Sequence, residues 1–177
     1  MSNIFKSLFS TRKKEQSPEA KLFIIGYEAL KIARKYELEK NKELTLKYYD
    51  IAVKGGVNEA LSPRAFILQK FDYDFEAIED FTIAITTSPT DPNIFFGRHL
   101  SKSKIGDIEG ALADIKQAIL LSKVNTRLNK EYDDEAQKFG YPNVEAFYNV
   151  YLRNVEMDTD LSMQDREDRK AKRKYRS

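Results

Sequence analysis

The side chains that most often carry catalysis or hold metals are scarce in this chain. Among its 177 residues there is one histidine, His99, and there is no cysteine. The usual zinc ligand sets combine several histidines and cysteines, so the sequence predicts no zinc site. A single histidine on a helix is more often a packing residue than a catalytic base, and we interpret His99 in that way. The absence of cysteine also excludes disulfides and thiolate chemistry, which fits a reducing compartment.

Acidic pairs and glycine-containing segments give no stronger evidence for an enzyme. In Glu79-Asp80 and Asp133-Asp134 the carboxylates are adjacent in the sequence, so they do not converge on one face of a helix. We interpret both pairs as solvated surface. Lys54-Gly55-Gly56 is expected to end a helix, whereas a phosphate-binding loop follows a strand and opens a helix. The sequence therefore predicts a protein without catalytic activity, cofactor or metal.

Positive charge is concentrated at the two ends of the chain. Residues 1–16 carry a net charge of +3, and residues 166–177 carry a net charge of +5. Because the whole chain has a formal charge of +2, subtraction leaves −6 for the residues between these ends. The clustered cations of these two basic tails are Lys6, Arg12, Lys13, Lys14, Arg169, Lys170, Lys172, Arg173, Lys174 and Arg176.

Each basic tail has a functional and a simpler interpretation. Apolar residues Ile4, Phe5, Leu8 and Phe9 share one helical face just ahead of the first cations, and such a segment can rest on an anionic membrane surface. We favour a frayed tail, or one that folds back onto the first helices. The C-terminal cations could bind phosphates of nucleic acid. No aromatic platform accompanies them, so we favour a solvated tail or one that pairs with the acidic middle.

A 34-residue repeat dominates the sequence between the tails. The stretch 61–88 is repeated in pattern at 95–122. Identical residues at this offset are Arg64 and Arg98, Lys70 and Lys104, Ala77 and Ala111, Asp80 and Asp114, Ala84 and Ala118, and Ile85 and Ile119. A period of this size indicates stacked helical units, because a single unit cannot bury its apolar face alone.

Start and stop signals divide this region into helices. Ser17 before Pro18 and Asp91 before Pro92 are typical helix N-termini. We expect helices over about 18–41, 43–54, 75–87, 92–105, 107–122, 128–139 and 144–156. The helix between 54 and 75 has two alternative starts, near Asn58 from the repeat pattern or at Ser62-Pro63 from the local signal.

This pattern resembles the tetratricopeptide repeat family, whose 34-residue units are helix–turn–helix pairs. The strongest match runs from Phe95-Phe96-Gly97-Arg98 to Gly110-Ala111-Leu112-Ala113-Asp114. An earlier, looser copy spans about residues 26–57. Its Ala33 lies 32 residues before Ala65, so the connection to the second copy is two residues short.

The resemblance implies an all-α fold, an α-solenoid of about three tetratricopeptide-like helical pairs with a C-terminal helical cap. We expect tails at 1–16 and 158–177, and a repeat domain at 17–157 with repeats at about 26–57, 58–91 and 92–123 and a cap at 126–157. The segment 52–60 also resembles the related Sel1-like repeats. The last two helices lack the repeat signature, and we interpret them as a cap that shields the apolar face of the third pair.

The resemblance also implies a binding groove lined by the first helix of each pair. By position, the groove residues are Tyr27, Leu30, Lys31, Arg34, Glu37, Phe66, Gln69, Lys70, Asn93, Phe96, Leu100 and Lys104. This mixture suits an extended peptide or a docked helix, with Phe66 and Phe96 as exposed anchors. Co-chaperone repeats hold a C-terminal carboxylate with lysine and asparagine at set places. Those places here contain Leu30, Arg34, Pro63, Asn93 and Gly97, so that clamp is not reproduced.

We therefore predict a non-catalytic adaptor or scaffold that binds a protein partner. The alternative is a peripheral factor that associates with membranes or nucleic acid through its basic tails. No apolar run approaches the roughly 20 residues that span a bilayer, and the N-terminus lacks the apolar core of a secretory signal. We expect a cytoplasmic location, with peripheral membrane contact as part of the alternative.

Overall fold

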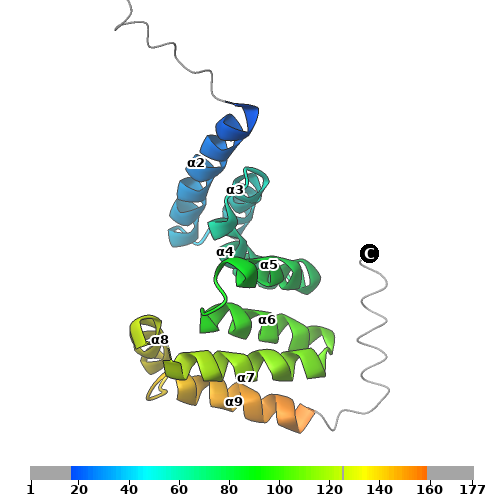
Figure 1. Cartoon of the computed structure of the whole chain (residues 1–177), viewed down its shortest axis with the longest axis vertical. Coiled ribbons are helices and arrows are strands. Elements are labelled where there is room, and N and C mark those ends of the chain that lie inside the picture. The colour runs from blue at the N-terminus through cyan, green and yellow to red at the C-terminus, as the bar shows by residue number, and fades with distance from the viewer. Residues whose placement is uncertain (1–16, 125, 159–177) are drawn as a thin grey trace, which may run out of the picture.

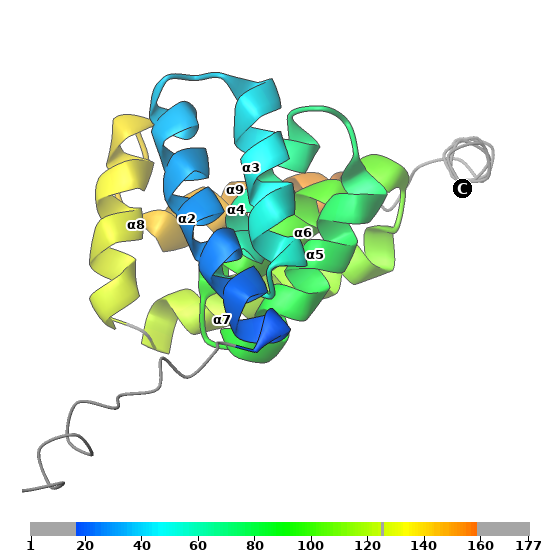
Figure 2. The same cartoon turned by 90° about the horizontal axis from the view of Figure 1, so that it is seen from above.

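Helices stacked along one axis form the part of the chain that the structure describes, a computed structural model of residues 17–124 and 126–158. In chain order the elements are α2 (Pro18–Leu38), α3 (Lys42–Lys54), the short 3-10 helix η1 (Asn58–Ala60), α4 (Leu61–Gln69), α5 (Asp74–Thr87), α6 (Pro92–Ile105), α7 (Ile108–Val124), α8 (Thr126–Lys138) and α9 (Val144–Asp158). Helical pairs α2–α3, α4–α5 and α6–α7 follow one another along the long axis (Figure 1). Seen from above, α2 and α3 lie over the later helices (Figure 2). The predicted all-α solenoid is confirmed.

Capping residues fix where the helices begin. The Ser17 hydroxyl oxygen accepts a hydrogen bond of 3.2 Å from the N–H of Ala20, and Pro18 opens α2. The Asp91 carboxylate accepts one of 2.9 Å from the N–H of Asn93, with Pro92 at the first helical position. Proline is well placed there because the first N–H groups of a helix have no intrahelical acceptor. Both predicted starts are confirmed.

The two alternative starts of the third helix are each partly correct. The backbone turns helical at Asn58 as a 3-10 turn, and α4 begins at Leu61. Pro63 therefore lies in the first turn of α4, where its missing N–H breaks no hydrogen bond. The repeat pattern and the local proline signal are thus compatible.

Small residues allow the helices of a pair to approach closely. The repeated alanines Ala77, Ala84, Ala111 and Ala118 are all buried. In the first pair Gly26 allows the helices to approach closely. A Cβ added there would lie 2.9 Å from the Cα of Gly55 and would force the helices apart.

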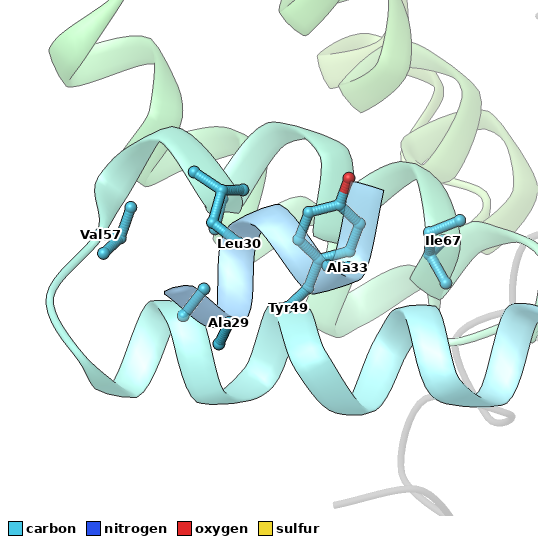
Figure 3. Close-up of a cluster of buried hydrophobic side chains, with 8 residues drawn as sticks. Ala29, Leu30, Ala33, Tyr49, Val57 and Ile67 are labelled. Carbon is cyan, nitrogen blue, oxygen red and sulfur yellow. The ribbon is translucent and has the colours of Figure 1, made fainter. Parts of the chain in front are cut away.

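The apolar core runs continuously from one pair to the next. Leu30 of α2, Tyr49 of α3 and Ile67 of α4 lie in one buried cluster (Figure 3). At the other end, Ile115 of α7 and Tyr148 of α9 share a cluster. The helices α8 and α9 therefore pack on the third pair and cover its apolar side chains.

Candidate partner-binding groove

An apolar cavity lies between α6, α8 and α9. Its volume is about 190 Å³, far more than one water molecule needs. The lining residues are Asn93 and Phe96 from α6, Tyr132, Glu135, Ala136 and Phe139 from α8, and Val144, Phe147 and Tyr148 from α9. The cavity thus contains two of the predicted groove residues, together with side chains from the two helices outside the repeat pattern.

Two carboxylates hold the helices around this cavity. The Tyr132 hydroxyl donates a 2.8 Å hydrogen bond to Asp91, the residue that caps α6. The Asp133 carboxylate accepts a 2.7 Å hydrogen bond from the N–H of Val144 at the start of α9. Burial, followed by the nearby Asp91 charge, raises the pKa of Tyr132, so its hydroxyl remains a neutral donor. Asp133 is therefore a structural acceptor, and its interpretation as solvated surface is wrong.

An aromatic cluster forms one wall of the cavity. The ring centroid of Phe96 lies 5.3 Å from that of Phe147 and 4.9 Å from those of Tyr148 and Tyr151. Only 7% of Phe96 is exposed, because α9 covers it. The prediction that Phe96 is an exposed anchor is wrong. The sequence signal for this contact was the aromatic composition of α9. The repeat pattern does not include α9, so it does not predict that α9 packs on α6.

The exposed aromatic at this site is Phe139, at the C-terminal end of α8. It is 67% exposed, and its ring stacks at 6.4 Å on that of Phe147. The nearby Glu135 carboxylate is paired at 2.6 Å with Lys138. The site combines an apolar interior with a rim of paired charges, so it can accept an apolar side chain of another molecule.

The predicted groove residues of α2 divide between surface and core. Tyr27, Lys31, Arg34 and Glu37 are exposed. Leu30 is 1% exposed within the core of the first pair, so its assignment as a contact residue is wrong. Its side chain packs with buried residues of α3 and α4 and does not face solvent.

Two predicted groove residues instead join the second pair to the third. Gln69 donates hydrogen bonds of 2.7 Å to the carbonyl of Gly97 and 2.8 Å to the Ser101 hydroxyl. Ser101 donates in turn to Asp74 at 3.0 Å, and Lys104 pairs with the other oxygen of Asp74 at 3.2 Å. Gln69 is therefore occupied by contacts within the molecule, and the groove assignment does not apply to it. Lys104 is ion-paired but its side chain is 50% exposed, so its groove assignment stays a prediction.

The remaining groove residues are partly or fully accessible. Phe66 is half-buried, and its ring meets that of Phe81 edge-on at 4.9 Å. Leu100 is half-buried against the cluster of the third pair, and Lys70 is exposed. Leu100 shares α6 with the cavity-lining Asn93, whereas Phe66 lies on α4 and Lys70 directly follows α4. None of these three residues lines the cavity.

Two buried arginine–aspartate ion pairs were not predicted from the sequence. Arg64 donates to both oxygens of Asp80, at 2.7 and 2.6 Å, and to Asp50 of the preceding pair at 3.0 Å. Asp80 is 3% exposed, so its interpretation as solvated surface is wrong. The sequence signal for these ion pairs is in the repeat, because an arginine followed 16 residues later by an aspartate occurs twice.

The second copy of this ion pair has the same geometry. Arg98 donates to both oxygens of Asp114, at 2.8 and 2.7 Å, and to the Thr82 hydroxyl of the preceding pair at 3.1 Å. Lys102 lies 2.8 Å from the same carboxylate. Each arginine therefore joins its own pair to the one before it.

His99 is a packing residue, as predicted. It is 1% exposed, and its Nδ1 lies 3.1 Å from the carbonyl oxygen of Ala111. Its ring stacks on Phe96 at 5.9 Å and meets Tyr151 edge-on. Burial lowers the pKa of His99 below its ordinary value, so the ring is neutral and Nδ1–H is placed to donate to Ala111.

Other kinds of site have no counterpart in the described residues. Over 17–124 and 126–158, no cluster of three or more potential metal ligands occurs. No helix in those ranges is both long enough and apolar enough to span a bilayer. The clustered cations of the basic tails lie outside the described residues.

Comparison with known proteins establishes the fold and nothing finer. No protein-family model matches the chain, and no curated protein matches it. Solved structures with a similar fold include "MamA 41-end from Desulfovibrio magneticus RS-1", with 11% identity, a TM-score of 0.54, and 77% of this chain and 78% of that chain covered. Another is "MamA RS-1 ArsTM double mutant", with 12% identity, the same TM-score and the same coverage. At such low identity the likeness concerns the arrangement of helices, a tetratricopeptide-like solenoid.

Proposed function

We propose that this chain is a non-catalytic protein-interaction module, an adaptor or scaffold that holds a peptide or helix of a partner protein. The observation that carries the proposal is the apolar cavity between α6, α8 and α9, with the 67% exposed Phe139 at its edge. An exposed aromatic ring beside an apolar cavity is costly in water unless another molecule covers it.

The partner contributes an apolar side chain that enters this cavity. Aromatic and large aliphatic anchors in desolvated pockets supply most of the affinity of such interfaces. The side-chain amide of Asn93, at the edge of the cavity, offers both a donor and an acceptor to the backbone of a bound peptide. Tyr27, Arg34 and Lys70 are also exposed, and we propose them as further contact residues from their positions in the repeat.

Selection of peptides against the purified full-length chain tests this function. A displayed library of random peptides should enrich sequences with a large apolar residue, and the affinity of a selected peptide can be measured by fluorescence polarisation. Phe139→Asp should weaken that affinity by about tenfold or more, because it removes the aromatic edge and introduces a charge beside the bound anchor. The fold should persist, since Phe139 is exposed.

Leu120→Asp is the matched control. Leu120 of α7 is 56% exposed and does not line the cavity, so this variant should bind the peptide like the wild type. The proposal fails if no peptide is enriched. It also fails if Phe139→Asp and Leu120→Asp have the same effect on affinity while both remain helical by circular dichroism.

A further inference from the structure

A buried tyrosine hydroxyl without a hydrogen bond distinguishes the cavity between α6, α8 and α9 from a purely apolar one. Tyr148 of α9 lines this cavity, and only 1% of the residue is exposed. No group of the described residues forms a hydrogen bond with its hydroxyl, yet the oxygen is not completely enclosed by protein atoms. The accessible part of this buried tyrosine therefore includes its hydroxyl, and the open space that it adjoins is the cavity.

The other polar side chains of the cavity have different roles. The Tyr132 hydroxyl donates to Asp91, and the Glu135 carboxylate is held in an ion pair. The amide of Asn93 is the group that we assign to the backbone of a bound peptide. Tyr148 is therefore the lining residue that can offer a hydrogen bond to the side chain of a ligand inside the cavity.

The rings around Tyr148 favour an aromatic ligand. The ring centroid of Tyr148 lies 4.9 Å from that of Phe96 and 5.9 Å from that of Phe147. Aromatic rings attract one another at such separations when they meet edge-on or offset. The cavity volume of about 190 Å³ also suits one ring system, because a cavity of about 150 Å³ lined by apolar side chains can bind benzene.

The Tyr148 hydroxyl selects among aromatic ligands. A plain phenyl ring would displace water from the hydroxyl without replacing its hydrogen bond, which weakens binding. A ring that carries an O–H or N–H group can restore that bond. Burial, followed by the charge of Asp91, raises the pKa of Tyr148, so its hydroxyl stays protonated and can donate as well as accept.

We propose that this cavity binds a tyrosine or tryptophan side chain of the partner protein, and that the Tyr148 hydroxyl forms a hydrogen bond with the polar atom of that ring. Both side chains combine an apolar body with a polar tip, which matches an aromatic cavity with this hydroxyl on its wall. The inference rests on the proposed function, and it adds the chemistry of the anchor and the residue that selects it.

Binding of two small aromatic probes to the full chain, measured by nuclear magnetic resonance titration, tests this selection. 4-Methylphenol reproduces the tyrosine side chain, and toluene reproduces that of phenylalanine. The wild type should bind 4-methylphenol about three- to tenfold more tightly than toluene, which is the net effect of one hydrogen bond. Tyr148→Phe should lose this preference. Its melting temperature should equal or exceed that of the wild type, because no described residue is bonded to the lost hydroxyl.

Tyr151→Phe is the matched control. It removes a hydroxyl from the same helix, beside the same Phe96 ring, but Tyr151 does not line the cavity. This variant should keep the preference for 4-methylphenol. Equal binding of the two probes by the wild type overturns the proposal, as does a preference that survives in Tyr148→Phe or disappears equally in Tyr151→Phe.

Peptides selected against the full chain separate this inference from the proposed function. Tyrosine or tryptophan should be enriched at the anchor position. Replacement of an anchor tyrosine by phenylalanine should weaken binding to the wild type by about three- to tenfold, and binding to Tyr148→Phe much less. Enrichment of leucine or phenylalanine anchors instead overturns the inference and leaves the proposed function intact. If no peptide is enriched, both fail, and a retained preference for 4-methylphenol would then indicate a small free aromatic molecule as the ligand.

Discussion

At the scale of single residues, burial decides the charge of His99. Its ring lies between Phe96 and Tyr151, and its Nδ1 faces the carbonyl of Ala111. Loss of solvation lowers the pKa of His99, while Ala111 and the nearby Asp114 only partly oppose that shift. A neutral histidine is therefore part of the packing between the third pair and α9.

Acid should destabilise the protein through this histidine. As pH falls through the ordinary histidine pKa of about 6.5, the unfolded chain binds a proton that folded His99 does not, so the free energy of unfolding decreases. His99→Gln retains a donor for Ala111 and should lose less stability between about pH 7.5 and about pH 5 than the wild type. At the higher pH the variant should be less stable by about 1–3 kcal/mol, because ring packing is lost.

Urea denaturation of both proteins at the two pH values provides the measurement. The stability difference between wild type and His99→Gln should shrink as the pH falls. A difference that stays constant would mean that His99 takes up a proton without cost, which contradicts its burial.

The arginine–aspartate pairs show that the importance of single residues can be predicted from the repeat, whereas their contacts cannot. Arg64 and Asp80 recur as Arg98 and Asp114, so their importance could be inferred from the sequence. Their pairing could not, because the adjacent Glu79-Asp80 suggested surface and nothing in one sequence shows which side chains meet. Deletion of one partner would leave an unpaired buried charge and should destabilise the fold.

At the scale of elements, helix contacts depend on the repeated alanines. Ala118 of α7 is completely buried in the cluster that contains Phe96 and Tyr148, and Ala84 of α5 is 3% exposed between the second and third pairs. Any larger side chain at these positions must displace a neighbouring helix.

Ala118→Glu and Ala84→Glu should each reduce the free energy of unfolding by about 3 kcal/mol or more, because each buries a carboxylate without a partner. Ala113→Glu is the control on the same helix as Ala118. Ala113 is exposed, so its effect should stay within about 0.5 kcal/mol. Circular-dichroism melts of the three variants decide the outcome, and native-like stability of both buried variants would contradict the helix contacts described above.

Helix positions could be predicted from the sequence, but the candidate site could not. Local signals such as Ser17-Pro18 and Asp91-Pro92 act within one turn, and the structure confirms them. The cavity depends on how α8 and α9 fold back onto α6, which is a tertiary contact between helices outside the repeat. Phe96 was therefore assigned to the exposed groove, although α9 covers it, and Phe139 was not assigned at all.

At the scale of the whole molecule, charge is distributed unevenly along the chain. The tails at 1–16 and 166–177 carry +3 and +5, and the residues between them carry −6. Clustered cations bind anionic surfaces through long-range attraction that salt screens. We propose that any association of this protein with anionic membranes or nucleic acid is carried by the tails.

A chain reduced to residues 17–165 tests that proposal. It should keep its helical content and its melting temperature within a few degrees, because the described helices and their core lie between Pro18 and Asp158. It should bind a selected peptide like the full chain, since every residue that lines the cavity is retained. In co-sedimentation with phosphatidylserine vesicles and with duplex DNA at low and moderate salt, any binding should be confined to the full chain and should weaken as salt rises. If the full chain binds neither at low salt, the tails have no such function and the membrane or nucleic-acid alternative is rejected. If the reduced chain binds as well as the full chain, the contact lies on the acidic middle of the protein, and the charge argument for the tails is wrong.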